Sequence, residues 1–290
     1  MDKILKAVSA DGFIRLRAVT LRHSVEKMRN MHYTTPVVTA ALGRTMSAAS
    51  MMGSGLKEEK GSLTLRISGG GPIGSVIAVS DAFGNVRAYA QNPQVVIEKR
   101  PDGKLNVGGA VGRDGLLTIT RDLGFGDPYI GSTALVSGEI GEDIAQYFVE
   151  SEQLGAAVGL GVLVDTDQSV IAAGGYILEL LPDADDNMLV KLEENIKQVG
   201  AVTNVLREHE LEVMVEQLLA GFSPQILETI PAEYRCYCSR ERVARALKSI
   251  GKEELEDMAK SEEDTVASCQ FCDIEHRFTP AEILALQRSK

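Results

Sequence analysis

Cysteine is missing from the first 235 residues of this 290-residue chain, tryptophan is missing throughout, and histidine occurs only four times. The few histidines form no recognisable serine–histidine–aspartate arrangement, so nothing indicates a hydrolase of that class. Structural disulfides would imply an oxidising compartment, yet residues 1–4 lead straight into a strand pattern and do not resemble a signal peptide. These absences favour a protein of the reducing cytoplasm.

An excess of positive charge and a long apolar run are also absent. The chain has 30 Lys and Arg against 41 Asp and Glu, and the net charge of −11 opposes binding to the phosphate backbone of nucleic acids. The longest stretch of small apolar residues, 36–56, contains Arg44 and several hydroxyl groups and is too polar to span a bilayer comfortably. We therefore expect neither nucleic acid nor membrane among the partners.

The first 181 residues combine helix and strand patterns. Residues 3–19 alternate around Asp11-Gly12, which predicts a hairpin closed by a two-residue turn. Helices are predicted over residues 21–32, over 141–151, and from Thr35-Pro36 onward, where the threonine caps a helix whose small residues are typical of central packing. Strands are predicted over residues 63–68, 74–80, 86–91, 116–120, 129–137, 158–164 and 170–178. Short connections favour antiparallel pairing, so the sequence predicts an α+β domain.

A glycine-rich segment, residues 69–74, matches the G-x-G-x-x-G pattern of dinucleotide-binding loops. A phosphate-binding loop must open a helix whose first N–H groups face the anion. Pro72 has no amide hydrogen, and residues 75–79 have the composition of a strand. The segment is therefore predicted to be a glycine-rich β-turn, and its role stays open.

The composition changes after Pro182. Acidic residues 183–186 indicate a helix start, amphipathic stretches follow over 188–199, 202–207 and 210–220, and Ser223-Pro224 is expected to open a short fourth helix. These helices have apolar stripes but little core of their own, so their apolar faces must lie on another part of the protein. The predicted division is an N-terminal domain, 1–181, a helical linker, 182–230, and a small C-terminal zinc domain, 231–290.

The four cysteines form two close pairs, Cys236-Tyr237-Cys238 and Cys269-Gln270-Phe271-Cys272. Zinc binds four thiolates tetrahedrally, and structural sites of this kind are assembled from two short knuckles. The spacing therefore predicts one zinc ion held by Cys236, Cys238, Cys269 and Cys272. His276 could compete as a ligand, but with four thiols available it is expected to be an exposed strand residue.

The segments around the cysteines predict a small domain that depends on its metal. A helix capped by Ser239, an acidic run over 253–264, strands over 265–268 and 274–278, and a capping box at 279–282 are expected. The domain has few large apolar residues, whereas structural zinc supplies an apparent ~10–16 kcal/mol at neutral pH. Because thiolate ligands can be oxidised to disulfides, a redox-triggered loss of order is chemically available. Taken alone, the residues favour a static zinc site.

The two cysteine pairs, separated by residues 239–268 near the end of a chain of this length, resemble those of the heat shock protein 33 family. The resemblance extends to residues 69–74 and to Asn92-Pro93-Gln94, and so covers essentially the whole chain. It implies a chaperone and not an enzyme: an ATP-independent holdase that protects unfolding client proteins and is inactive while reduced and zinc-bound. On oxidation, the resemblance implies disulfides between Cys236 and Cys238 and between Cys269 and Cys272, release of zinc, loosening of the linker, exposure of apolar surface, and homodimerisation.

Two other functions stay open. The cysteine-bearing segment could be a static zinc-ribbon adaptor in a protein complex, which insensitivity to oxidants would support. The protein could also be a thiol oxidoreductase, because Cys269-Gln270-Phe271-Cys272 has the spacing of that active motif. The motif belongs at a helix start in a βαβ setting, which this short segment does not offer.

Overall fold

The computed structural model describes residues 1–181, 184, 186–261 and 263–288, and it divides into two compact units, Met1–Arg235 and Cys236–Lys290. The helices expected between residues 182 and 230 belong to the first unit. The three-part division predicted from the sequence stays a prediction. Within the described residues, no helix is both long enough and apolar enough to cross a membrane.

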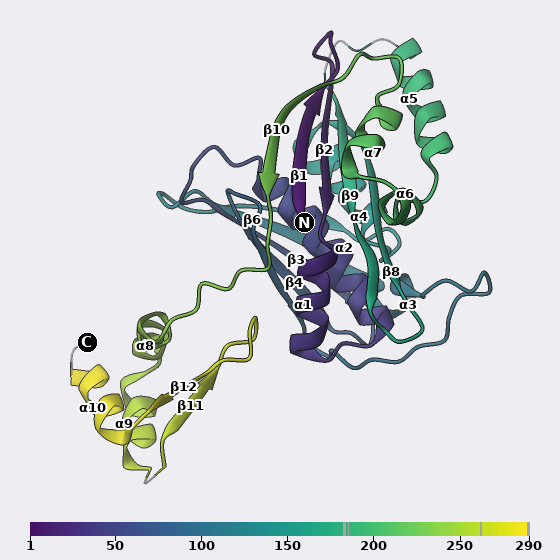
Figure 1. Ribbon diagram of the computed structural model, residues 1–290. Helices are drawn as coiled ribbons and strands as arrows, with labels where there is room; N and C mark the ends of the chain where they lie inside the picture. The colour runs from purple at the N-terminus through teal and green to yellow at the C-terminus, as the bar shows by residue number, and fades with distance from the viewer. Residues whose placement is uncertain (182–183, 185, 262, 289–290) are drawn as a thin grey trace. The chain divides into compact units, whose positions relative to one another are not determined.

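The first unit contains two five-stranded sheets (Figure 1). Sheet A has the order β10 (Gln225–Pro231), β1 (Lys3–Val8), β2 (Ile14–Thr20), β9 (Val170–Leu180) and β8 (Gly155–Val164). Sheet B has the order β5 (Val86–Ala90), β4 (Ser75–Asp81), β3 (Ser62–Gly70), β6 (Gly112–Asp122) and β7 (Tyr129–Ala134). All neighbouring strands are antiparallel, which confirms the predicted α+β fold.

Helix α2 (Pro36–Gly53) is the centre of the first unit. It contacts strands of both sheets, and all of its residues except Pro36 and Arg44 are buried. A Cβ atom at Gly43 would lie 2.6 Å from Cγ2 of Val162, so glycine permits this close approach to β8. The predicted central helix is confirmed. The other helical segments of this part are α1 (Arg22–His32), α3 (Val107–Val111), α4 (Gly141–Tyr147) and a π-helical turn, η1 (Phe148–Glu152).

Sheet A buries side chains on both faces. Ile4, Val19 and Ile177 belong to the core that contains α2, whereas residues next to them in sequence face a second core on the other side. Helices α5 (Asp186–Val199), α6 (Val202–Glu208) and α7 (Leu211–Leu218) cover that second face (Figure 1). Their buried hydrophobic residues are Leu192, Val202, Val205, Leu211, Met214, Val215 and Leu218. The predicted apolar stripes therefore pack on sheet A, and we call these three helices the cover.

The glycine-rich segment is a turn between β3 and β4, as predicted. The Gly74 N–H donates to the Gly71 carbonyl at 3.0 Å, and the Asn92 side-chain amide donates to the Pro72 carbonyl at 2.7 Å. Strand β4 follows at Ser75, so the turn itself does not open a helix. The segment closes a hairpin and lacks the geometry of a phosphate-binding loop.

Two predictions about local capping and turns were wrong. The hairpin between β1 and β2 is closed by the five residues 9–13, because the Asp11 carboxylate accepts from the Ser9 hydroxyl and the Phe13 N–H and so holds a wider loop. Thr35 precedes α2, but its side chain does not cap the helix. Its hydroxyl donates instead to the Val95 carbonyl at 2.5 Å.

Further differences lie in the helical and acidic stretches. Ser223-Pro224 opens no helix, because the following residues form β10 and pair with the open edge of β1. The predicted acidic helix start includes Asp183 and Asp185, which lie outside the described residues, and α5 begins at Asp186. The predicted helix over 141–151 changes to a π-helical turn at Phe148.

A buried ion pair joins β2 to β9. The Arg17 guanidinium donates to the Glu179 carboxylate, whose side chain is 4% exposed, and to the Met51 carbonyl at 3.2 Å. Burial lowers the pKa of Arg17, while the charge of Glu179 acts in the opposite direction. Without its partner, either charge would be buried and uncompensated.

Replacing Arg17 with methionine is expected to destabilise the first unit by about 3–5 kcal/mol, because Glu179 would stay buried without a counter-charge. Urea unfolding followed by circular dichroism measures the loss. Arg15→Met, at an exposed position of the same strand, is the matched control and should change stability by about 0.5 kcal/mol or less. Equal losses of unfolding free energy in the two variants would contradict a stabilising role of the Arg17–Glu179 pair.

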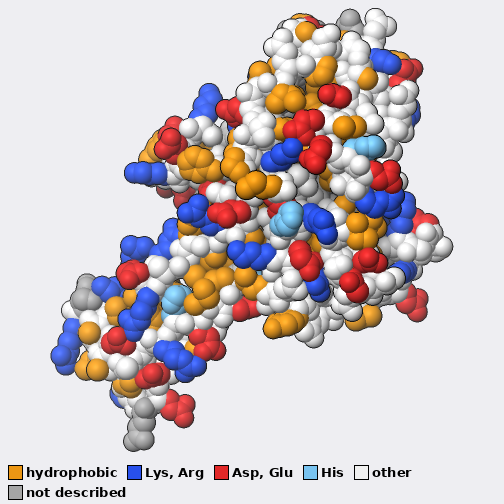
Figure 2. All heavy atoms as spheres, in the orientation of Figure 1, with side chains coloured by type: hydrophobic (Ala, Val, Ile, Leu, Met, Phe, Trp, Pro, Cys, Tyr) orange, Lys and Arg blue, Asp and Glu red, His pale blue; other side chains and the backbone are white. Residues whose placement is uncertain are grey.

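The second unit has its own small framework. Its elements are α8 (Arg240–Ser249), α9 (Lys252–Lys260), β11 (Thr265–Ser268), β12 (Glu275–Phe278) and α10 (Pro280–Arg288). The Ser239 hydroxyl accepts from the Arg242 N–H, and Thr279 and Glu282 form the predicted capping box. Helix α9 was not predicted within the acidic run. On the face of the molecule in Figure 2, acidic and basic side chains of the described residues are interspersed.

Candidate metal centre

The two cysteine pairs lie on different kinds of local structure. Cys236 and Cys238 are in the extended segment that precedes α8, whereas Cys269 and Cys272 are in the turn between β11 and β12. In that turn the Cys269 N–H donates to the Ile274 carbonyl at 3.0 Å and the Cys272 N–H to the Cys269 carbonyl at 3.2 Å. The second pair therefore forms a hairpin knuckle. It does not open a helix, as the active motif of a thiol oxidoreductase would.

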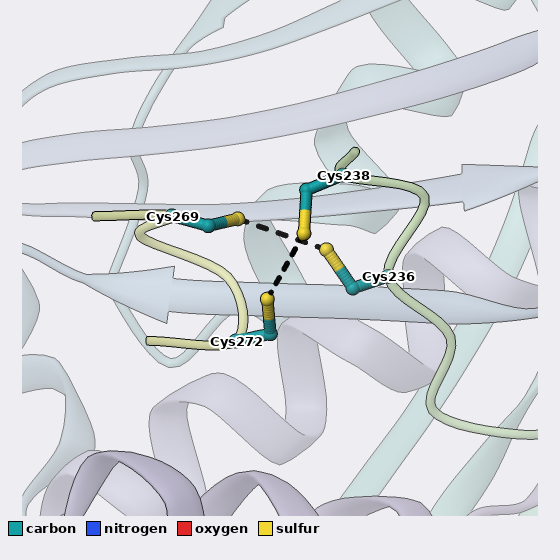
Figure 3. A group of neighbouring side chains, drawn as sticks. All are labelled: Cys236, Cys238, Cys269 and Cys272. Atoms are coloured by element: carbon teal, nitrogen blue, oxygen red, sulfur yellow. Dashed lines mark hydrogen bonds between the residues drawn. The ribbon is translucent and has the colours of Figure 1, made fainter. Parts of the chain in front are cut away.

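The structure brings all four predicted residues together. Their Sγ atoms lie within 4.8 Å of one another, and each side chain is partly buried (Figure 3). The Sγ atoms of Cys236 and Cys269 are 3.7 Å apart, and those of Cys238 and Cys272 are 3.3 Å apart. A tetrahedral zinc site with Zn–S bonds of ~2.3 Å has S···S edges of about 3.8 Å. The four thiols, all of them free, therefore fit a metal ion of that size.

The ionisation of the thiols differs across the cluster. Burial raises the pKa of Cys238 and of Cys272. Burial also acts to raise the pKa of Cys269, but the Phe271 backbone N–H and the neighbouring thiols outweigh it and lower that pKa overall. Four thiolates this close repel one another unless a cation compensates their charge.

His276 is not among the residues that could jointly hold a metal. It lies on β12 as predicted, but it is partly buried and not exposed, and its Nε2 atom has no hydrogen-bond partner among the residues that the structure describes. His276 and Phe278 are two residues apart on one strand and therefore share a face. Phe278 is 1% exposed, so the face that carries the histidine is the one packed on the core of this unit.

The hydrophobic core beside the cysteines is small. Among the described residues of the unit, its buried apolar side chains are Leu247, Leu255, Phe278 and Ile283. Arg240 supplements them: its guanidinium binds the Glu282 carboxylate at 2.8 Å and lies 4.4 Å from the ring centroid of Phe278. No local pattern in the sequence indicates this contact, because it joins residues about forty positions apart. So small a core leaves much of the folding free energy to be supplied by a ligand.

Comparisons with known proteins agree along the whole chain. The family model described as "Hsp33 protein" matches residues 2–279. A "33 kDa chaperonin" from Clostridioides difficile (strain 630) is 44% identical over 286 residues, covering 98% of each chain. One from Bacillus subtilis (strain 168) is 40% identical over 287 residues, covering 99% of this chain and 98% of the relative.

A solved structure gives the same result. The crystal structure of the 33 kDa chaperonin (heat shock protein 33 homologue) from Thermotoga maritima matches with a TM-score of 0.91 and 35% identity. The match covers 99% of this chain and 98% of that one. With the family model, the sequence relatives and the fold in agreement, the chain belongs to the Hsp33 family.

Proposed function

We propose that this protein is a redox-regulated, ATP-independent holdase chaperone that keeps unfolding client proteins from aggregating. Its family and the names of its relatives support a chaperone and not an enzyme. The observation that carries the redox part is the cluster of four free thiols, with Sγ atoms within 4.8 Å, in a unit with few buried apolar residues. The reduced protein would be inactive and reside in the cytoplasm.

In the reduced state, Cys236, Cys238, Cys269 and Cys272 would hold one zinc ion. The tetrahedral fit of their sulfur atoms and the affinity of zinc for thiolates support this assignment. Bound zinc would supply most of the folding free energy of residues 236–290. The hairpin knuckle places two ligands on one turn, and Ser239, by capping α8, fixes the segment that carries the other two.

Oxidation would remove the metal ligands. In each disulfide, two thiols lose two electrons and two protons in total to an oxidant such as a peroxide, which is reduced to water. The proposed pairs are Cys236 with Cys238 and Cys269 with Cys272. Disulfide sulfurs bind zinc poorly, so oxidation would release the metal and unfold the second unit, whose own core is small.

The cover on sheet A is the proposed source of client-binding surface. Its buried residues include Leu211, Met214 and Leu218, each 1% exposed or less, and they belong to the same core as Leu16 and Leu178 of the sheet. When the cover loosens, both partners of this contact expose apolar side chains. A flexible, methionine-containing surface can adapt to many unfolded chains, and two protomers with such surfaces would associate as homodimers.

The direct test is aggregation of a heat-unfolding client protein, followed by light scattering, with zinc release measured in the same samples. The peroxide-treated, zinc-free protein is expected to suppress scattering, and the reduced zinc-loaded protein is not. A preparation treated with peroxide and then with dithiothreitol and zinc is the control for reversibility. If both forms leave scattering unchanged and zinc is retained, a static adaptor becomes the better proposal.

A further inference from the structure

The four residues before Cys236 connect the edges of both sheets. After β10 leaves β1, the Ala232 N–H donates to the Asp2 carbonyl at 3.1 Å. The next residues pair with β5 of sheet B: the Val86 N–H donates to the Glu233 carbonyl at 2.9 Å, and the Arg235 N–H donates to the Val86 carbonyl at 3.0 Å. We call residues 232–235 the latch. It is attached to sheet A at one end and to sheet B at the other.

Tyr234 anchors the latch. Its side chain is 3% exposed and belongs to the core that contains α2. Its hydroxyl donates to the Ala88 carbonyl at 3.2 Å, and the Lys27 ammonium donates to the Tyr234 carbonyl at 3.2 Å. An aromatic ring buried among these partners is a far stronger attachment than the backbone bonds of a surface strand alone.

Strand β10 has no such anchor of its own. None of its side chains is fully buried: Ile230 is partly buried against the core that contains α2, and Leu227, left unpaired where the register shifts, is 62% exposed. Its ion pair, Lys6 with Glu228 at 2.7 Å, is solvated and contributes little. The strand is therefore held by its bonds to β1, by the partly buried Ile230 and by the latch that follows it.

We propose that the latch sets the threshold at which the cover opens after the cysteines have been oxidised, an inference that rests on the proposed function. The cover lies between β9 and β10 in sequence. While Tyr234 stays buried, residues 181–224 are fixed at both ends, so their release gains less conformational entropy than release of a chain with one free end. Unfolding of residues 236–290 alone then leaves the cover in place. Heat or another unfolding condition must first free Tyr234, after which β10 can leave β1.

The test compares Tyr234→Ala and Tyr234→Phe in the full chain. Hydrogen exchange is measured on the reduced, zinc-loaded protein, and the temperature at which a hydrophobic dye binds is measured after peroxide treatment. In reduced Tyr234→Ala, exchange of the β10 amides is expected to quicken at least about tenfold with zinc content unchanged. Its oxidised form should bind dye at a lower temperature than the oxidised wild type. Tyr234→Phe keeps the ring but loses the hydroxyl. Its β10 exchange rate and its dye-binding temperature should therefore lie between those of the wild type and of Tyr234→Ala.

Ile144→Ala is the control for general loss of stability, because Ile144 is fully buried in α4, an element outside sheet A and the latch. The proposal is overturned if β10 exchange is unchanged in Tyr234→Ala. It is equally overturned if the dye-binding temperature of oxidised Tyr234→Ala is not below that of the oxidised wild type, or if Ile144→Ala lowers this temperature as much as Tyr234→Ala does. Client aggregation is measured separately. Failure of the oxidised wild type to suppress it at any temperature would reject the holdase function, while exchange and dye binding still test the latch.

Discussion

Replacing Cys238 with serine is expected to release zinc from the reduced protein and to unfold residues 236–290, while residues 1–235 keep their structure. A serine hydroxyl stays protonated at neutral pH and cannot replace a thiolate ligand. Structural zinc in small domains is associated with an apparent ~10–16 kcal/mol, and the buried apolar residues of this unit are too few to make up a large part of that loss. Metal analysis after dialysis and hydrogen exchange of the full chain measure the two effects.

Ser268→Ala is the matched control for this variant. Ser268 is exposed at the end of β11 and directly precedes the knuckle, but it offers no ligand. It should leave zinc content and amide protection unchanged. Retention of one zinc per chain by the Cys238→Ser protein, with normal protection of α8 and α10, would contradict the four-thiolate site.

The second large effect is expected from Met214→Asp, which places a charge between the cover and sheet A. Met214 is fully buried in α7 and packs in the core formed with β1, β2 and β9. Burying an unpaired carboxylate destabilises such a contact by on the order of 4 kcal/mol or more, so the cover should detach. The reduced, zinc-loaded variant is then expected to bind a hydrophobic dye and to suppress client aggregation without an oxidant.

Gln217→Asp is the corresponding control, since it introduces the same side chain at an exposed position of the same helix. It should change stability by about 0.5 kcal/mol or less and leave the reduced protein inactive. Detachment of the cover in Met214→Asp, seen as rapid exchange of α5–α7, without any chaperone activity would show that client proteins bind elsewhere.

Regular periodicity explains what the sequence predicted well. Strand β3 of sheet B alternates between buried and more exposed residues, and the helices of the cover have one apolar stripe each, so their patterns could be recognised locally. Helix α9 could also have been found, because Leu255, Met258 and Ala259 have helical spacing within its acidic run. Strand β10 could not, since its residues are mostly exposed and its partner β1 is more than two hundred positions away.

Part of the candidate site could likewise be predicted from the sequence, and part could not. The type and spacing of the cysteines predicted a common cluster, and the structure brings their sulfur atoms together. Which thiols lie in contact could not be predicted. Cys236 approaches Cys269, and Cys238 approaches Cys272, so each contact joins one cysteine of the first pair to one of the second. That arrangement depends on how α8, β11 and β12 pack, and on the contact between Arg240 and Phe278.

The pairing of β1 with β10 also has a consequence for biosynthesis. β1 is made first, but the strand that completes its side of sheet A ends at Pro231. At roughly 5–20 residues per second, β1 waits on the order of 10–45 seconds for this partner. During that time its unpaired N–H and C=O groups form an open sheet edge, a surface prone to pairing with other chains. The nascent protein therefore passes through a stage in which it is itself prone to aggregate.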